Sequence, residues 1–350
     1  MKTENITLSN NDKLGILSDL STMLSAGIPL LESVNALIED SKGNQKKLLE
    51  ALRGDLTQGK HVYFTFSKFP NVFTKVTASI VKASEEAGTL DVTLKDLKEN
   101  LKKEIEFSDK VKSALIYPLF IVFVFFGVLL MILIVVIPKI ASVFSRLKAD
   151  LPLPTKILIF MSDTLLNYTI PVVLGILVFA IVIFFVYRKK KTLLLNILFR
   201  LPLLSNLAKD IDLTKFSRSF YLLLNAGIPI TNALELTEDV VVKKEVNEAI
   251  KHAREAVVKG KKLSEGFKDK RRVFPSMAIR ITEAGERSGT LDKSMVEISE
   301  FLDYQVGVRL KTATALLEPI LLVVIGGLVG GMMLAIIGPI YGLIGQIGQR

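Results

Sequence analysis

The chain has 350 residues, of which 50% are hydrophobic and 23% charged, and its 45 Lys and Arg outnumber its 35 Asp and Glu. These fractions are compatible only if the apolar residues are segregated, and three uncharged runs occur at 113–138, 164–187 and 319–349. Each run exceeds the roughly 20 residues that a helix needs to cross the hydrocarbon core. The composition therefore excludes an ordinary soluble protein, and the absence of cysteine excludes disulfides, thiolate metal sites and cysteine nucleophiles.

The uncharged runs predict how the chain crosses the membrane. Lys and Arg beside the runs number fourteen on the side of the two large polar blocks and five on the other side, which predicts that both blocks are cytoplasmic. These cations suit contact with anionic lipids rather than nucleic acid, because they gather at span ends. In chain order we expect a cytoplasmic helical-bundle domain at 1–112, a transmembrane helix at 113–138, an external loop at 139–163, a transmembrane helix at 164–187, a second cytoplasmic bundle at 188–315, a transmembrane helix at 316–340 and an external tail at 341–350.

The two polar blocks carry the same motifs at an almost constant spacing. Ala26-Gly27-Ile28-Pro29 recurs 200 residues later, and Gly88-Thr89-Leu90-Asp91 recurs 201 residues later. The register continues into the membrane, where Pro118 pairs with Pro319. Each copy thus consists of a cytoplasmic domain followed by one outward span. The unpaired run at 164–187 would return the chain to the cytoplasm, which makes this a parallel repeat.

The repeated motifs have the composition of helix junctions. A glycine able to adopt positive φ ends one helix, and a proline suits the first turn of the next. Thr and Asp after the later glycine suit the cap and first turn of another helix. Because strand signals are weak throughout, we predict an all-α membrane protein with two homologous cytoplasmic bundles and three transmembrane helices. The junction positions are Gly27, Pro29, Gly88, Gly227, Pro229 and Gly289.

Small residues and prolines mark the uncharged runs. Gly326 and Gly330, with Gly327 and Gly331, form a stripe that predicts close helix packing within or between subunits. Pro118 and Pro319 stand near the start of their runs, where a missing N–H has little effect.

Few residues suggest a catalytic, metal-binding or cofactor-binding role. The carboxylates Glu85, Glu86 and Asp91 form an acidic cluster with two interpretations, an oxygen-only cation site or helix-terminus charges and salt bridges. The two histidines in the chain are too few for an obvious metal or acid–base site. No phosphate-binding loop occurs in the sequence. We therefore expect no catalytic residue, no cofactor and no enzymatic activity.

Glu318 is a carboxylate at the entrance of the last span. An ionisable group there is a candidate for partner contact. The alternatives are that its side chain reaches the lipid headgroups or pairs with Lys311 or Arg309.

Several stretches, in order over nearly the whole chain, resemble the type II secretion F / type IV pilus inner-membrane platform family. In the first copy, Ser84 replaces the first glycine of the family's Gly-Glu-x-Ser-Gly pattern. The stretches that carry the resemblance are the two Ala-Gly-Ile-Pro turns, Gly285–Leu291, Tyr117-Pro118, Val136-Ile137-Pro138, Leu151–Thr155 and Glu318-Pro319.

This resemblance implies a non-enzymatic, multi-pass platform of the inner membrane that forms homo-oligomers. A cytoplasmic hexameric ATPase would engage its bundles, and pilin or pseudopilin subunits would meet its spans, together with other inner-membrane assembly proteins. ATP-driven movement of the platform would then lift pilins from the bilayer into the fibre.

Two other classes of function stay open at this stage. A small transporter or channel would need polar groups lining a path through the bilayer, and the three runs contain no charged residue. A membrane signalling adaptor would leave surface fibres and secretion intact when deleted. The sequence does not distinguish a pilus from a secretion or DNA-uptake machine.

Overall fold

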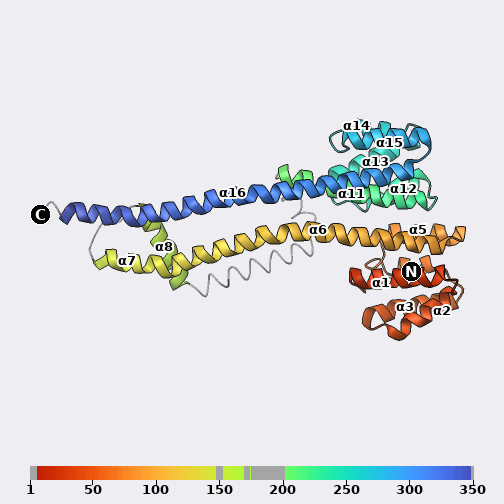
Figure 1. Ribbon diagram of the computed structural model, residues 1–350, viewed down its shortest axis with the longest axis horizontal. Helices are drawn as coiled ribbons and strands as arrows, with labels where there is room; N and C mark the ends of the chain where they lie inside the picture. The colour runs from red at the N-terminus through yellow and green to blue at the C-terminus, as the bar shows by residue number, and fades with distance from the viewer. Residues whose placement is uncertain (1–5, 147–152, 169–173, 175–201, 348–350) are drawn as a thin grey trace. The chain divides into compact units, whose positions relative to one another are not determined.

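The computed structural model describes residues 6–146, 153–168, 174 and 202–347, and this part of the chain contains helices and no strand (Figure 1). The chain divides into two compact units. One comprises Met1–Lys110 and Phe199–Val308, and the other comprises Val111–Leu198 and Arg309–Arg350.

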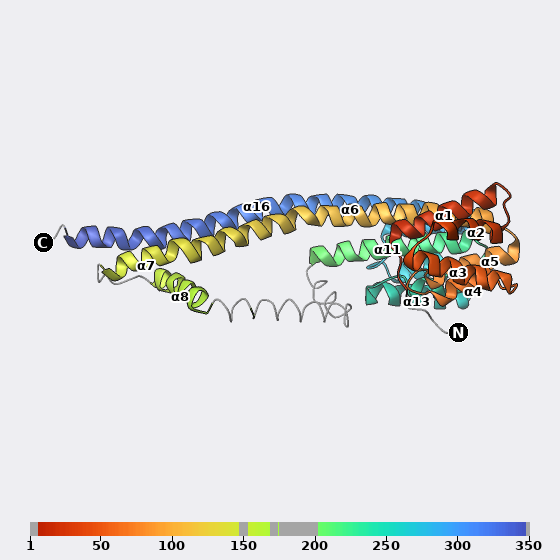
Figure 2. The ribbon, with the colours of Figure 1, turned by 90° about the horizontal axis from the view of Figure 1, so that it is seen from below.

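The first unit contains both copies of the repeat as helical bundles, which confirms the prediction of an all-helical fold with two repeated domains. Figures 1 and 2 show α1–α5 gathered in one bundle. The helices of the first copy are α1 (Asn10–Ser25), α2 (Leu30–Asp40), α3 (Gly43–Thr57), α4 (Val62–Lys68), α5 (Lys75–Ala87) and the start of α6 (Leu90–Met131). Those of the second copy are α11 (Pro202–Asn225), α12 (Ile230–Glu238), α13 (Lys244–Val258), α14 (Leu263–Asp269), α15 (Ser276–Ser288) and the start of α16 (Leu291–Ile347).

The junction between the first two helices of each copy has the same backbone geometry. Gly27 has φ 79° and Gly227 has φ 75°, in the left-handed region that glycine adopts at little cost. The next N–H reaches back five residues in each copy, and in the first copy Ile28 donates to the Met23 carbonyl at 3.0 Å. Pro29 and Pro229 then occupy the N-cap positions of α2 and α12.

A stacked pair of phenylalanines lies in the core of each bundle. The rings of Phe66 and Phe73 are 3.6 Å apart between centroids, and those of Phe267 and Phe274 are 3.9 Å apart. All four side chains are buried. The two pairs occupy equivalent positions at the spacing of 201, so the repeat extends from the turns into the core.

A glutamate from the fifth helix of each copy caps the short fourth helix. Both carboxylate oxygens of Glu85 accept N–H groups at the start of α4, from Val62 at 2.6 Å and Tyr63 at 2.9 Å. Glu286 binds the start of α14 in the same way, accepting the Leu263 N–H at 2.5 Å and the Ser264 N–H at 3.2 Å. A carboxylate at a helix N-terminus satisfies free donors and complements the helix dipole.

Two of the described helices are long and apolar enough to cross a membrane. The apolar stretches lie within Leu90–Ser142, which begins with α6 and extends beyond it, and within Leu291–Gly331 of α16. The second predicted span, 164–187, lies outside the described residues apart from 164–168 and Leu174.

The segment expected as an external loop, 139–163, is helical in much of its described part. It contains the end of α7 (Ile137–Arg146) and most of α8 (Leu153–Asn167), and Figure 2 shows these two helices close together. Helix α8 packs on α7 and on the π-helical turn η1 (Ile132–Val136) before it. Of the stretch Leu151–Thr155, which lies in this expected loop, residues 151 and 152 lie outside the described residues, and the rest begins α8.

Candidate functional site between the two repeats

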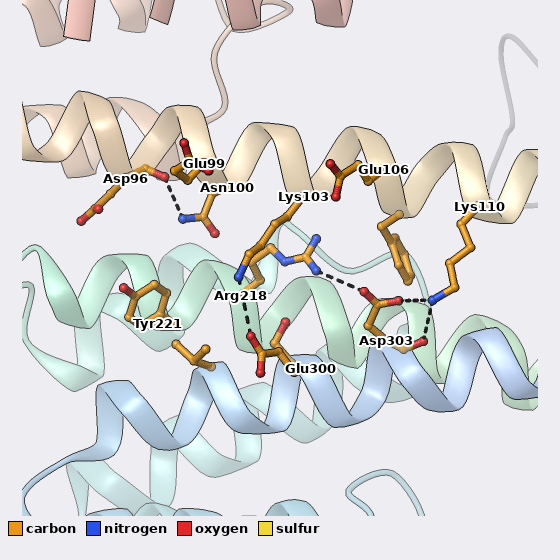
Figure 3. A pocket seen from close by; sticks show the side chains of 13 residues that line it. Asp96, Glu99, Asn100, Lys103, Glu106, Lys110, Arg218, Tyr221, Glu300 and Asp303 are labelled. Atoms are coloured by element: carbon orange, nitrogen blue, oxygen red, sulfur yellow. Dashed lines mark hydrogen bonds and ion pairs between the residues drawn. The ribbon is translucent and has the colours of Figure 1, made fainter. Parts of the chain in front are cut away.

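A cavity of about 440 Å³ lies in the first unit, between α6 of the first copy and α11 and α16 of the second (Figure 3). Five carboxylates and three cationic side chains line its wall. The carboxylates are Asp96, Glu99, Glu106, Glu300 and Asp303, and the cations are Lys103, Lys110 and Arg218.

Arg218 of α11 is the central cation of this cavity. Its side chain is 13% exposed, and its Nη2 atom lies 3.9 Å from Asp303 Oδ2. The guanidinium carbon lies 5.8 Å from the ring centroid of Phe107, which belongs to the first copy. Burial lowers the pKa of Arg218, and Asp303, Glu104 and Glu300 oppose that effect. Because arginine stays protonated at physiological pH, a positive charge is held between the copies.

Ion pairs and a hydrogen bond join the copies around Arg218. Lys110 Nζ lies 2.8 Å from Asp303 Oδ1, and Lys103 Nζ lies 3.6 Å from Glu300 Oε1. At the other end of the cavity, Asn225 donates to Asp96 Oδ2 at 3.0 Å. Half-exposed pairs of this kind contribute about 0–1 kcal/mol each.

A further ion pair joins the copies outside the cavity. Lys75, at the start of α5, lies 2.7 Å from Asp239, at the end of α12. Its hydrogen bond to Asp239 raises the pKa of Lys75.

A second, smaller cavity of about 200 Å³ also lies between the copies. Val76, Leu222 and Arg218 are among the residues that line it.

The charged groups pair with one another across the boundary, so ion pairs and hydrogen bonds link the two bundles. Among the described residues, no group of three or more His, Asp and Glu is placed to hold a metal ion.

The three carboxylates of the predicted acidic cluster make different contacts in the structure. Glu85 is 9% exposed and caps α4 with both oxygens. Glu86 is 66% exposed and lies 3.9 Å from Lys82. Asp91 lies in the first turn of α6.

The remaining predicted positions lie as follows. Gly88 and Gly289 end α5 and α15 with φ of 70° and 73°. Pro118 and Pro319 lie inside the long helices α6 and α16 rather than at their starts. Within the described residues, and apart from the surrounding turns of its own helix, no atom lies within 4 Å of the position that a Cβ would take on any glycine of the stripe at Gly326, Gly327, Gly330 and Gly331. Glu318 belongs to α16, and its side chain lies outside the described part.

The departure from the family pattern at Ser84 has a local explanation. In the second copy α15 and α16 approach so closely that a Cβ on Gly285 would overlap Ser294 Oγ. In the first copy Ser84 fits, is buried, and donates to the Val81 carbonyl at 2.9 Å. The two copies therefore pack this helix pair differently.

The sequence did not predict the residues between the copies. One feature of the sequence could have indicated Arg218: it is a cation between two phenylalanines, Phe216 and Phe220. Both phenylalanines are buried in the structure. Its contacts come from α6 and α16, and no local spacing identifies partners that distant.

Comparison with known families agrees with this geometry. A family model described as "Type II secretion system (T2SS), protein F" matches residues 16–138 and again residues 216–339. The two matched ranges coincide with the two copies of the repeat. The chain belongs to this family. The resemblance found from the motifs is thereby confirmed, and so is the duplication.

Individual members of the family match almost the whole chain. The "Type IV pilus assembly protein PilC" of Thermus thermophilus is 32% identical over 337 residues, which cover 94% of this chain and 81% of that protein. The protein of the same name from Myxococcus xanthus is 28% identical over 343 residues, covering 97% and 82%. The "Type II secretion system protein F" of Vibrio cholerae is 26% identical over 336 residues, covering 95% and 82%.

Proposed function

We propose that this chain is the inner-membrane platform protein of a type IV pilus or type II secretion machine, and that it has no catalytic activity of its own. The observation that carries the proposal is the double family match, because it assigns both halves of the chain to one family of assembly proteins. Relatives matched over most of their length are named for pilus assembly and for type II secretion.

The proposed mechanism uses the continuity between bundles and spans. In each copy the helix that follows the fifth bundle helix continues into an apolar stretch, as α6 and α16. A hexameric ATPase would bind the cytoplasmic bundles and displace them, and these helices would carry the displacement to pilin or pseudopilin subunits in the bilayer. The polar bonds between the copies, centred on Arg218, would let one bundle follow the other.

The proposed topology has three spans, with both bundles in the cytoplasm of the cell that makes the fibre. It rests on three uncharged runs and on the excess of Lys and Arg beside them on the bundle side. The unpaired run at 164–187 serves as the return span. Other inner-membrane assembly proteins and anionic lipids would surround the spans.

A clean deletion tests the function. Deletion should abolish surface fibres or secretion of the machine's substrates, and the full chain expressed from a plasmid should restore them. Normal fibres and normal secretion in the deletion strain would contradict the proposal.

Coupling to the ATPase needs its own measurement. The full chain, solubilised in mild detergent, should co-purify with the machine's hexameric ATPase, while an unrelated inner-membrane protein carrying the same tag should not. If fibres are lost on deletion but no ATPase is retained, the platform assignment stands and the coupling step is wrong.

A further inference from the structure

The two copies of the repeat contact each other through unlike faces. Helix α5 of the first copy packs against α11 and α12 of the second. The equivalent helices are α15 in the second copy and α1 and α2 in the first, and among these described helices there is no comparable packing. A two-fold arrangement would repeat the contact in both directions, so this one is heterologous.

Exposure at equivalent positions shows which faces stay uncovered in this chain. Val76 of α5 is 6% exposed where the copies meet, whereas Met277, its equivalent on α15, is 41% exposed. On the other side, Leu222 of α11 is 9% exposed, and its equivalent Thr22 on α1 is an exposed residue. Each copy therefore has one face covered by the other copy and one equivalent face open.

The ion pair between the copies identifies the positions at the centre of these faces. Lys75 bonds to Asp239. At the spacing of the repeat, Lys75 corresponds to Ser276 and Asp239 to Glu39. We define the open α15 face by Ser276, Met277 and Arg280, and the open α2 face by Glu32, Ala36 and Glu39.

The two open faces have opposite charges. Helix α2 contains Glu32, Glu39 and Asp40 and no cationic residue. On α15, Glu286 caps α14, and Glu283 lies 3.1 Å from Lys268 and 2.7 Å from Arg287. Arg280 is exposed and has no ion-pair partner among the described residues. An unpaired cation on one face and unpaired carboxylates on the other are complementary.

We propose that the open α15 face of one chain docks on the open α2 face of a second copy of this chain. The contact would repeat the arrangement already present within the chain, with Arg280 near Glu32 and Glu39. Each chain has one face of each kind, so every chain can bind a neighbour on both sides. Such heterologous contacts build closed rings or open rows of subunits. This inference concerns self-association and does not depend on the proposed function.

Introduced cysteines test the contact directly, because the natural chain has none. One full-length chain carries Glu39→Cys and a differently tagged chain carries Ser276→Cys, and the two are co-expressed in membranes. A short bismaleimide should join them into a covalent dimer. A single chain with both substitutions should give a ladder of covalent oligomers.

Two matched controls accompany this experiment. Lys75→Cys with Asp239→Cys in one chain should crosslink within the monomer, which reports that the reagent reaches this kind of contact. Glu50→Cys, on α3 of the first copy, should not crosslink to Ser276→Cys. Dimers from Glu39→Cys alone or from Ser276→Cys alone would indicate a two-fold contact and overturn the proposal. So would failure of the inter-chain pair while the intrachain pair reacts.

Charge reversal gives an independent readout without cysteines. Arg280→Glu should weaken self-association of the detergent-solubilised chain about tenfold in sedimentation, since like charges across an interface oppose binding. Adding Glu39→Arg to the same chain should restore association. Lys47→Glu, an equal change of charge on α3, should have no effect. Unchanged association with Arg280→Glu would contradict the assigned face.

Discussion

At the scale of single residues, partly buried carboxylates hold the fourth helix of each bundle against the fifth. Glu85 and Glu286 are far from their partners in sequence and cap helices of only seven residues. Helices that short are not stable alone in water. The family's glycine–glutamate motif thus has a structural role, since it fixes the fourth helix against the fifth.

Removal of the cap in the second copy should destabilise that bundle. Glu286→Ala leaves two N–H groups without their acceptor and should reduce the free energy of unfolding by about 2 kcal/mol. Glu286→Gln keeps one acceptor and should cost about half as much. Thermal unfolding of the solubilised chain measures both, with the exposed Glu86→Ala as control. An equal effect of Glu86→Ala would contradict a specific capping role.

Asp55 should make the first bundle sensitive to acid. Burial raises the pKa of Asp55, but bonds from Lys68, Thr65 and Lys60 outweigh burial and hold the pKa below its usual value. The stabilisation is therefore present above the ordinary aspartate pKa of about 3.9 and is lost as pH falls through the lower, folded value. Hydrogen exchange of α3 and α4 should show this loss.

The second copy supplies the control for this measurement. Its equivalent position is Ala256, so α13 and α14 lack this source of acid sensitivity. Asp55→Asn should lower the stability of the first bundle at neutral pH and should remove its contribution to the acid transition. A first bundle with unchanged acid sensitivity in this variant would show that other groups control it.

At the scale of elements, the proline that follows the π-helical turn η1 leaves one carbonyl of that turn without a backbone donor. In a π-helix the Leu133 carbonyl would accept from the residue five positions later, which is Pro138 and has no N–H. Ser162 of α8 supplies the missing donor, with its hydroxyl 2.6 Å from the Leu133 oxygen. Both residues are buried, so the bond fixes α8 against η1.

A double-mutant cycle tests this explanation. Ser162→Ala leaves a buried carbonyl without a donor and should cost about 1–3 kcal/mol. Pro138→Ala restores a backbone N–H, so Ser162→Ala should cost much less in that background. Protease resistance of the solubilised chain over a denaturant series gives the comparison. Equal costs in both backgrounds would contradict the role assigned to Pro138.

At the scale of the whole molecule, the sequence predicted the features that are local or repeated. The paired Gly-x-Pro turns, the glycine helix ends and the two apolar stretches on α6 and α16 all depend on residues close together in the chain. The contacts of Arg218 with Asp303 and Phe107 join residues about 85 and 110 positions apart. Helix α8 lies in the segment predicted as an external loop; Pro154 stands in its first turn, where proline is well tolerated, so a proline there does not exclude a helix.

The central proposal is that one unit, a bundle followed by a span, was duplicated with both bundles on the same side of the membrane. Single cysteines at Glu50 and at its equivalent Lys251 report the side of each bundle, and a cysteine at Lys156 reports the segment between the first two proposed spans. In intact cells stripped of their outer membrane, a membrane-impermeant maleimide should label only the cysteine at position 156. The cysteines at positions 50 and 251 should react only after lysis. Labelling of one of these two, but not the other, in intact cells would place the bundles on opposite sides and contradict the account.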